Sequence, residues 1–215
     1  MQRGNPKRTD ASVDADVTRI SLLSRVRDGS DDAAWVEFEN RYRDLILRYA
    51  LARGVQHADA DDICQIVMMS LATALRSFRY SSERGRFRDY LGRVVRNAVA
   101  RHRSRPNRTT VSLDNFGDPS EPTEGTDEED LRWEQEWVNH HYRLAMQTIR
   151  RTFEAKSVEV FGRLVEGASV GDVAAAYEMT EQAVHKIKQR IRARLAELIA
   201  AQVRDEEEIR EPGIT

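Results

Sequence analysis

Arginine is concentrated in one stretch of the chain. Residues 84–108 hold nine arginines and a single acid, Asp89, on a background of apolar residues at helical spacing. A guanidinium can bridge a phosphate through two hydrogen bonds, and asparagine can read an adenine edge or an unpaired base. The stretch therefore has the chemistry of a nucleic-acid contact. The candidate residues are Arg84, Arg86, Tyr90, Arg93, Arg96, Asn97, Arg101 and Arg103.

Two aromatic residues lie beside the Arg84–Arg86 segment. Aromatic rings next to a basic loop can stack on exposed bases, as they do in proteins that bind single strands. For Phe87 we favour packing in the core, because it begins an apolar stripe. For Tyr90 the sequence leaves core packing and base stacking open.

A second candidate lies near the C-terminus. Ser169 and Asp172 resemble a capping box, and Glu178–Thr180 predict a turn in which Thr180 caps the next helix. That helix has an apolar side and a polar side, as a DNA-recognition helix of a helix-turn-helix requires. An ordinary amphipathic surface helix is the alternative interpretation. The residues predicted to face DNA are Gln182, His185, Lys186, Gln189 and Arg190.

Composition limits the class of protein. The 215 residues are enough for one large or two small domains, and 40% hydrophobic with 33% charged residues indicates a folded, helix-rich chain. No apolar run is long enough for a membrane span and the first twenty residues are polar, so we expect neither a membrane anchor nor a signal peptide. The lone Cys64 rules out an internal disulfide. We expect a cytoplasmic protein.

The net charge of −2 conceals blocks of opposite sign. Residues 114–136 carry ten acids and one arginine, and four consecutive acids at 205–208 lie near the C-terminus. Two interpretations stay open for these acids. They either restrain the basic helices from binding DNA indiscriminately, or only keep a linker and a tail soluble.

Helical periodicity recurs along the chain, and no strand-like alternation of useful length is present. We predict an all-α fold of two helical domains joined by a flexible acidic linker. The expected helices run from about Trp35 to Gly54, Asp59 to Phe78, Phe87 to Pro106 and Leu131 to Phe153, followed by a short helix capped by Ser157 and the helix-turn-helix. The predicted divisions are a disordered extension (1–19), a first domain (20–106), the linker (107–128), a second domain (129–203) and an acidic tail (204–215).

The second predicted helix has apolar residues on its polar face. Ile66 and Met69 lie there beside Asp62 and Gln65, which suggests a surface that another protein covers. Scattered apolar surface residues are the alternative. Cys64 falls nearer the buried side, where we expect a small core residue.

Several of these segments resemble bacterial sigma factors. Asp59-Ala60-Asp61-Asp62-Ile63-Cys64-Gln65-Ile66-Val67 is similar to their Asp-Ala-x-Asp-Leu-x-Gln-x-Val stretch. Gly85-Arg86-Phe87-Arg88-Asp89-Tyr90-Leu91, followed by Arg96-Asn97, resembles their Gly-x-Phe-Arg-x-Trp-Leu…Arg-Asn segment, with Tyr90 in place of the usual Trp. With the helix-turn-helix behind them, the chain resembles a two-domain sigma factor of the extracytoplasmic function (ECF) type.

The resemblance implies a function in transcription initiation. The first domain would be a sigma-2 domain that binds core RNA polymerase through Asp62, Gln65, Ile66 and Met69. The Tyr80–Arg86 loop with Arg93, Arg96 and Asn97 would melt and read the −10 element of promoter DNA. A sigma-4 domain would read the −35 element through the helix from Glu181. The resemblance implies no enzymatic activity, cofactor or metal, and it leaves open whether an anti-sigma factor, the tails or synthesis alone restrains the protein.

Two other functions are compatible with parts of the sequence. A stand-alone helix-turn-helix regulator would use the first hundred residues for sensing or dimerisation, but they show no ligand-pocket or phosphoacceptor signature. A DNA-processing enzyme would need a nucleophile, and usually a metal site or a phosphate-binding glycine-rich loop, and the sequence offers neither of these. Binding to core RNA polymerase separates the sigma factor from both.

Overall fold

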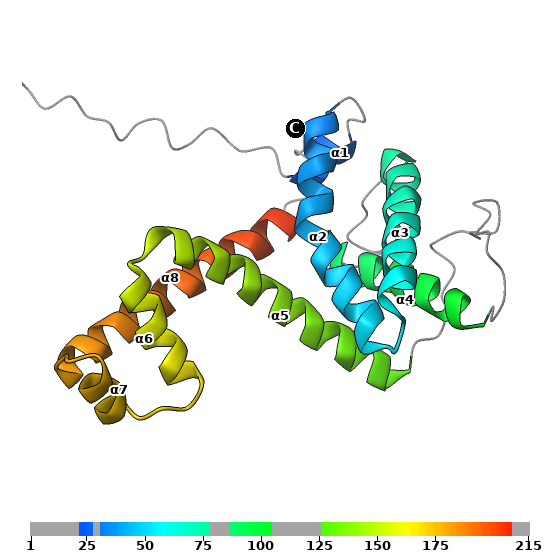
Figure 1. The fold of residues 1–215 in the computed structure, drawn as a ribbon. Helices are drawn as coiled ribbons and strands as arrows, with labels where there is room; N and C mark the ends of the chain where they lie inside the picture. The colour runs from blue at the N-terminus through cyan, green and yellow to red at the C-terminus, as the bar shows by residue number, and fades with distance from the viewer. Residues whose placement is uncertain (1–21, 28–30, 78–86, 105–125, 208–215) are drawn as a thin grey trace, which may run out of the picture.

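Helices form the whole of the described architecture, which confirms the predicted all-α class (Figure 1). A computed structural model describes residues 22–27, 31–77, 87–104 and 126–207, and contains no strand among them. None of the helices in these ranges is both long and apolar enough to cross a membrane. The helices are α1 (Leu22–Arg27), α2 (Asp32–Ala52), α3 (His57–Ser77), α4 (Phe87–Arg103), α5 (Asp127–Thr152), α6 (Ala155–Val165), α7 (Val170–Ala176) and α8 (Glu181–Glu207).

The helix ends follow local sequence signals in most places. Gly54 has a φ of +82°, a left-handed conformation that glycine adopts readily, and it directly follows the last turn of α2. The Ser169 Oγ accepts a hydrogen bond from the backbone N–H of Asp172 at 3.1 Å, as the predicted cap requires. The prediction that Ser157 caps a helix was wrong, because α6 begins earlier, with Glu154 at its N-cap position.

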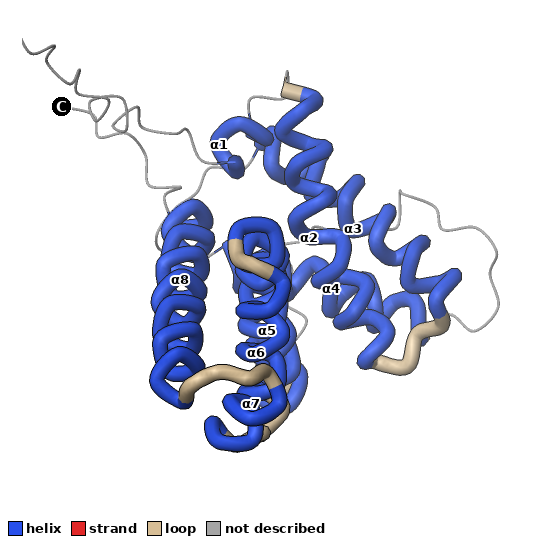
Figure 2. Tube along the Cα trace, turned by 60° about the vertical axis from the view of Figure 1, so that its left-hand side comes forward, coloured by secondary structure: helices blue, strands red, loops and turns tan. Residues whose placement is uncertain are grey.

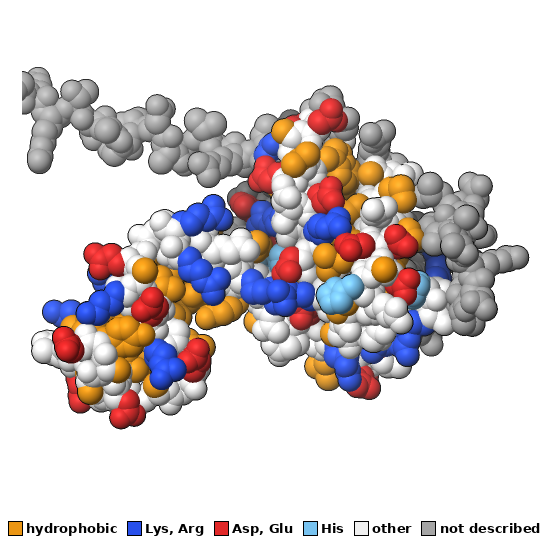
Figure 3. All heavy atoms as spheres, in the orientation of Figure 1, with side chains coloured by type: hydrophobic (Ala, Val, Ile, Leu, Met, Phe, Trp, Pro, Cys, Tyr) orange, Lys and Arg blue, Asp and Glu red, His pale blue; other side chains and the backbone are white. Residues whose placement is uncertain are grey.

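Buried side chains form three clusters. The first lies among α1, α2, α3 and α4, and the second lies among α5, α6 and α8. A third, smaller cluster joins α6 and α7 to the start of α8. The space-filling view shows the result as a larger and a smaller lobe (Figure 3).

Helix α5 belongs to both lobes. Its first half places Trp133 and Trp137 in the first cluster, 2% and 4% exposed, while Ala145, Met146 and Ile149 from its second half lie in the second cluster. The expected division at residue 129 assigned the whole of this helix to the second domain. In the structure the two tryptophans complete the core of the first.

Trp133 comes unusually close to the backbone of α4. A Cβ added at Gly92 would lie 2.6 Å from the indole nitrogen of Trp133, and that nitrogen donates a hydrogen bond to the carbonyl of Arg88 at 3.2 Å. Glycine at position 92 is therefore what lets the Trp133 side chain of α5 lie against the backbone of α4.

Helix α8 returns from the small lobe to the large one, side by side with α5 (Figure 2). Its last turns extend beyond the predicted start of the acidic tail at residue 204, and Glu206 is only 8% exposed. The Tyr42 hydroxyl donates a hydrogen bond of 2.8 Å to this carboxylate, and His141 Nε2 lies 3.3 Å from it. Part of the expected tail is thus a buried contact, because Tyr42 and His141 provide polar partners for the carboxylate.

His140 is the least satisfied polar residue of this region. Its side chain is 1% exposed, and neither ring nitrogen has a hydrogen-bond partner within the described part of the chain. Burial, reinforced by the neighbouring His141, lowers the pKa of His140 from 6.5 to about 3. The folded protein consequently holds this imidazole in its neutral form.

We predict that Gly92→Ala destabilises the protein. The added methyl group must displace a buried indole, and such overpacking costs about 1–3 kcal/mol, which exceeds the gain of up to about 1 kcal/mol in helix propensity. Urea unfolding measures the change. Gly162→Ala in α6 is the matched control, because nothing lies within 4 Å of its added Cβ, and it should stabilise the protein. Equal effects of the two substitutions would contradict the close packing of Trp133.

We predict that acid destabilises the fold through His140. The unfolded chain binds a proton near pH 6.5 that the folded chain accepts only near pH 3, so stability falls as the pH drops through this window. The slope for one proton is about 1.4 kcal/mol per pH unit. Urea unfolding between pH 7 and 4.5 should therefore show a steeper loss for the wild type than for His140→Leu. Parallel curves for the two proteins would refute this assignment.

Candidate nucleic-acid interface

The helix-turn-helix forms as the sequence predicts, from α7, a short turn and α8. Thr180 Oγ1 accepts a hydrogen bond from the N–H of Ala183 at 3.2 Å and so caps α8. Val184 and Ile191 are fully buried and fix the helix to its lobe. Glu178 in the turn has a φ of +51°, a left-handed conformation that is strained for a residue with a side chain.

The residues predicted to read DNA on α8 share one exposed surface. All five are exposed: Gln182, His185, Lys186, Gln189 and Arg190. The guanidinium of Arg190 lies 5.6 Å from the centre of the Phe153 ring, a cation–π contact that orients it at the edge of this surface. The polar side chains near the N-terminal end of α8 are therefore accessible to a major groove.

The predicted surface on α4 is only partly accessible. Arg103 is exposed, and Arg93 and Arg101 are half-buried. The side chain of Arg96 is 16% exposed and forms an ion pair of 3.2 Å with Asp130 of α5. Arg84 and Arg86 lie outside the described residues.

Two of the predicted contacts on α4 are not on the surface. Asn97 is 6% exposed, so the expectation that it faces DNA is wrong for this arrangement, and Tyr90, for which core packing and base stacking were both open, is 8% exposed and lies in the core. Helix α4 has neighbours on several sides, because it contacts α2, α3 and α8 and the Trp133 side chain lies against Gly92. The Asn97 Oδ1 has no hydrogen-bond partner among the described residues.

The start of α5 brings acids against the arginines of the first lobe. Arg88 forms an ion pair of 2.9 Å with Glu134, and Arg53 pairs with Glu129. Arg53 is not among the residues predicted from the sequence, because it lies at the end of α2, far from the arginine-rich stretch. The acidic block of 114–136 was the only signal of a partner for such residues.

The predicted polymerase-binding surface on α3 is accessible. Asp62, Gln65 and Met69 are exposed, Met69 by 41%, and Ile66 is half-buried. The opposite face of α3 packs into the first cluster, where Cys64 is fully buried. Burial raises the pKa of the Cys64 thiol to about 11, as expected of an unreactive core residue.

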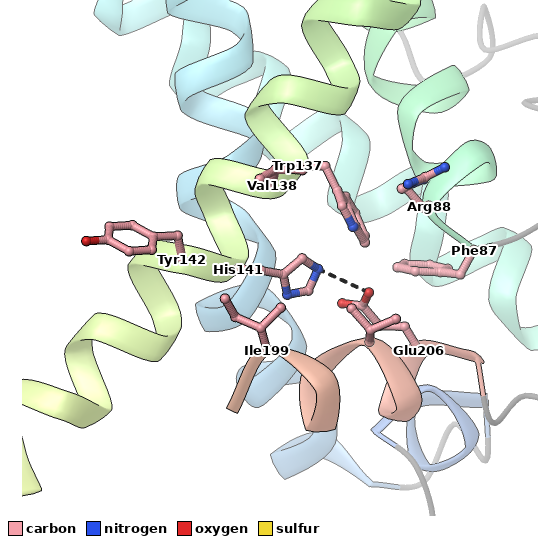
Figure 4. A pocket seen from close by; sticks show the side chains of 9 residues that line it. Phe87, Arg88, Trp137, Val138, His141, Tyr142, Ile199 and Glu206 are labelled. Atoms are coloured by element: carbon pink, nitrogen blue, oxygen red, sulfur yellow. Dashed lines mark ion pairs between the residues drawn. The ribbon is translucent and has the colours of Figure 1, made fainter. Parts of the chain in front are cut away.

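A cavity of about 300 Å³ lies where α4, α5 and α8 meet (Figure 4). Phe87, Trp137 and Ile199 form its apolar walls, and the His141–Glu206 pair also lines it. Its position makes it a gap at the joint between the two lobes. No group of three or more side chains suited to holding a metal ion occurs among the residues that the structure describes.

Comparison with known families finds one match, in the first lobe. Residues 40–109 match the family model of sigma-70 region 2, and this part of the chain is similar to that family. The match includes α3 and α4, the helices that carry the predicted polymerase-binding and −10 residues. It confirms the resemblance to bacterial sigma factors drawn from the sequence motifs.

Comparison with solved structures finds similar chains. The chain is similar to the solved structure described as CnrH in complex with the cytosolic domain of CnrY. The two chains are 20% identical, with a TM-score of 0.33 over 84% of this chain and 96% of that chain. No curated protein sequence matches the chain.

Proposed function

We propose that this protein is a sigma factor of the ECF type, which binds core RNA polymerase and directs it to promoters. The observation that carries the proposal is the presence of a sigma-70 region 2 and an accessible helix-turn-helix in one chain. A single-module regulator needs only the second of these. The proposed role is to position the polymerase on two DNA elements and requires no catalytic residue.

Each accessible surface has a role in this proposal. The exposed row of α3 with Asp62, Gln65 and Met69 docks on the polymerase. The arginines of α4 contact the −10 element, and the polar row of α8 reads base edges of the −35 element. We retain a sigma-2 domain at about 20–106, a linker at 107–128 and a sigma-4 domain at about 129–203, with α5 packing on both.

Run-off transcription tests the proposal directly. The purified chain should bind duplex DNA weakly alone and start transcription from genomic fragments only with core polymerase, because its two reading surfaces need a scaffold to fix their spacing. A stand-alone helix-turn-helix regulator is the second candidate, favoured by the accessible α8. Tight, sequence-specific binding by the free chain with no affinity for core polymerase would establish the regulator instead.

We predict that Gln65→Glu combined with Met69→Glu abolishes core polymerase binding. The two acids add negative charge and remove an exposed apolar contact, yet neither side chain is in the core, so helical content should not change. Competition with the unmodified chain for core polymerase measures the effect. Val36→Glu combined with Asn40→Glu, which places the same charges on exposed positions of α2, is the control. If both double variants compete equally well, the docking surface is wrongly assigned.

We predict that substitutions of base-reading residues and of phosphate-contacting residues change promoter binding in different ways. Replacing His185 or Lys186 by alanine should lose about 1–3 kcal/mol at particular −35 base pairs and relax the preference there. Arg103→Gln should weaken binding evenly across promoters and reduce the salt slope by about one. Transcription of a promoter library by polymerase carrying each variant distinguishes the two patterns. A wild-type −35 preference in the His185 and Lys186 variants would place the reading surface elsewhere on α8.

A further inference from the structure

We propose that Arg53, Arg96 and Arg103 form a binding site for DNA phosphate, and that Glu129 and Asp130 occupy this site in the free chain. The acidic start of α5 thus acts as a built-in mimic of the DNA backbone. The proposal rests on the proposed function, because it concerns how the first lobe engages DNA. It adds Arg53 to the contact surface and gives the acids beyond residue 114 a specific role.

The site is a cleft of about 400 Å³ between three helices. Arg53 enters it from the end of α2, and Arg96 and Arg103 enter it from α4. The two α4 arginines are seven residues apart and so lie on one face of the helix, two turns from each other. Tyr49 forms part of the wall, and Glu129 of α5 lines the remaining side.

Two of the arginines need an anion in this position. The side chains of Arg53 and Arg96 are only 18% and 16% exposed, so they have lost much of their hydration. A guanidinium held in this way is costly unless a negative group compensates it. Glu129 compensates Arg53, and Asp130 compensates Arg96 at 3.2 Å. When these acids leave, a phosphate group can replace them, because its oxygens carry negative charge and can accept hydrogen bonds from a guanidinium.

The acids can leave without undocking α5. They lie in its first turn, which Thr126 caps through a hydrogen bond of 3.3 Å to the N–H of Glu129. Leu131 is 70% exposed, and Trp133 is the first buried residue of the helix. Unwinding one turn therefore frees Arg53 and Arg96 while the tryptophan anchor stays in the core.

Two other acids in the first turn of α5 provide a matched control for the experiment. Asp127 and Glu128 are exposed, and Glu128 pairs within the helix with Arg132 at 2.7 Å and not with an arginine of the first lobe. Neutralising these two acids changes the net charge as much as neutralising Glu129 and Asp130. Any general effect of charge on DNA binding is therefore equal in the two double variants, and only the second pair empties the cleft.

The experiment measures binding of the full-length protein to a fluorescent duplex of mixed sequence over a range of salt concentrations. Glu129→Gln with Asp130→Asn should tighten binding by about tenfold relative to Asp127→Asn with Glu128→Gln. The Glu129→Gln, Asp130→Asn variant should also show a steeper salt dependence. The slope of the logarithm of the DNA-binding constant against the logarithm of the salt concentration should increase by about one for each phosphate newly bound. Equal affinities and slopes for the two double variants, or weaker binding by the first, would overturn the proposal.

A second comparison shows whether the arginines receive the phosphate. Adding Arg53→Gln and Arg96→Gln to the first double variant should remove its gain in affinity and its extra slope, while urea unfolding checks that the fold persists. A gain that survives loss of both arginines would overturn the proposal. Because this readout needs no polymerase and no promoter, it is independent of core-dependent transcription, on which the proposed function is judged.

Discussion

The burial of Trp133 against Gly92 is the closest contact between α5 and α4 in this protein. An indole buried at 2% exposure lies against a backbone without a Cβ, at a distance that any larger residue would prevent. Since α5 also packs on α2 and continues without interruption into the second core, it joins the two lobes. The end of α8 then reaches Tyr42, where the buried carboxylate of Glu206 fastens the return helix.

This arrangement determines which arginines of the first lobe meet acids. Once Trp133 is seated, the turn before it lies beside Arg53 and Arg96, and the turn after it lies beside Arg88. The sequence left two roles open for the acids, and the ion pairs with Arg53 and Arg96 support restraint of the basic helix. Solubility alone would not require Glu129 and Asp130 to pair with arginines that are more than four-fifths buried.

Sequence patterns predicted what depends on local chemistry. The stripe from Phe38 to Tyr49, the cap at Ser169 and the exposed row on α8 each follow from residues within a few turns of one another, and all are present in the structure. The family match supports the motif around Asp62 in the same way. Asn97 was placed on a surface because the pattern of α4 shows one apolar side. Periodicity within one helix cannot reveal which other helices pack around its remaining sides.

The contacts that sequence could not predict are those between segments distant in the chain. Arg53 and Glu129 are 76 residues apart, and Tyr42 and Glu206 are 164 apart. In both, a charged residue is partly or fully removed from water, which is tolerable only because a partner arrives from another helix. The two contacts differ in access to water, because Arg53 and Glu129 are partly exposed whereas Tyr42 and Glu206 are buried. The start of α5 is therefore joined to the large lobe through polar groups that can exchange partners, whereas Trp133 and the Tyr42–Glu206 contact lie in the interior.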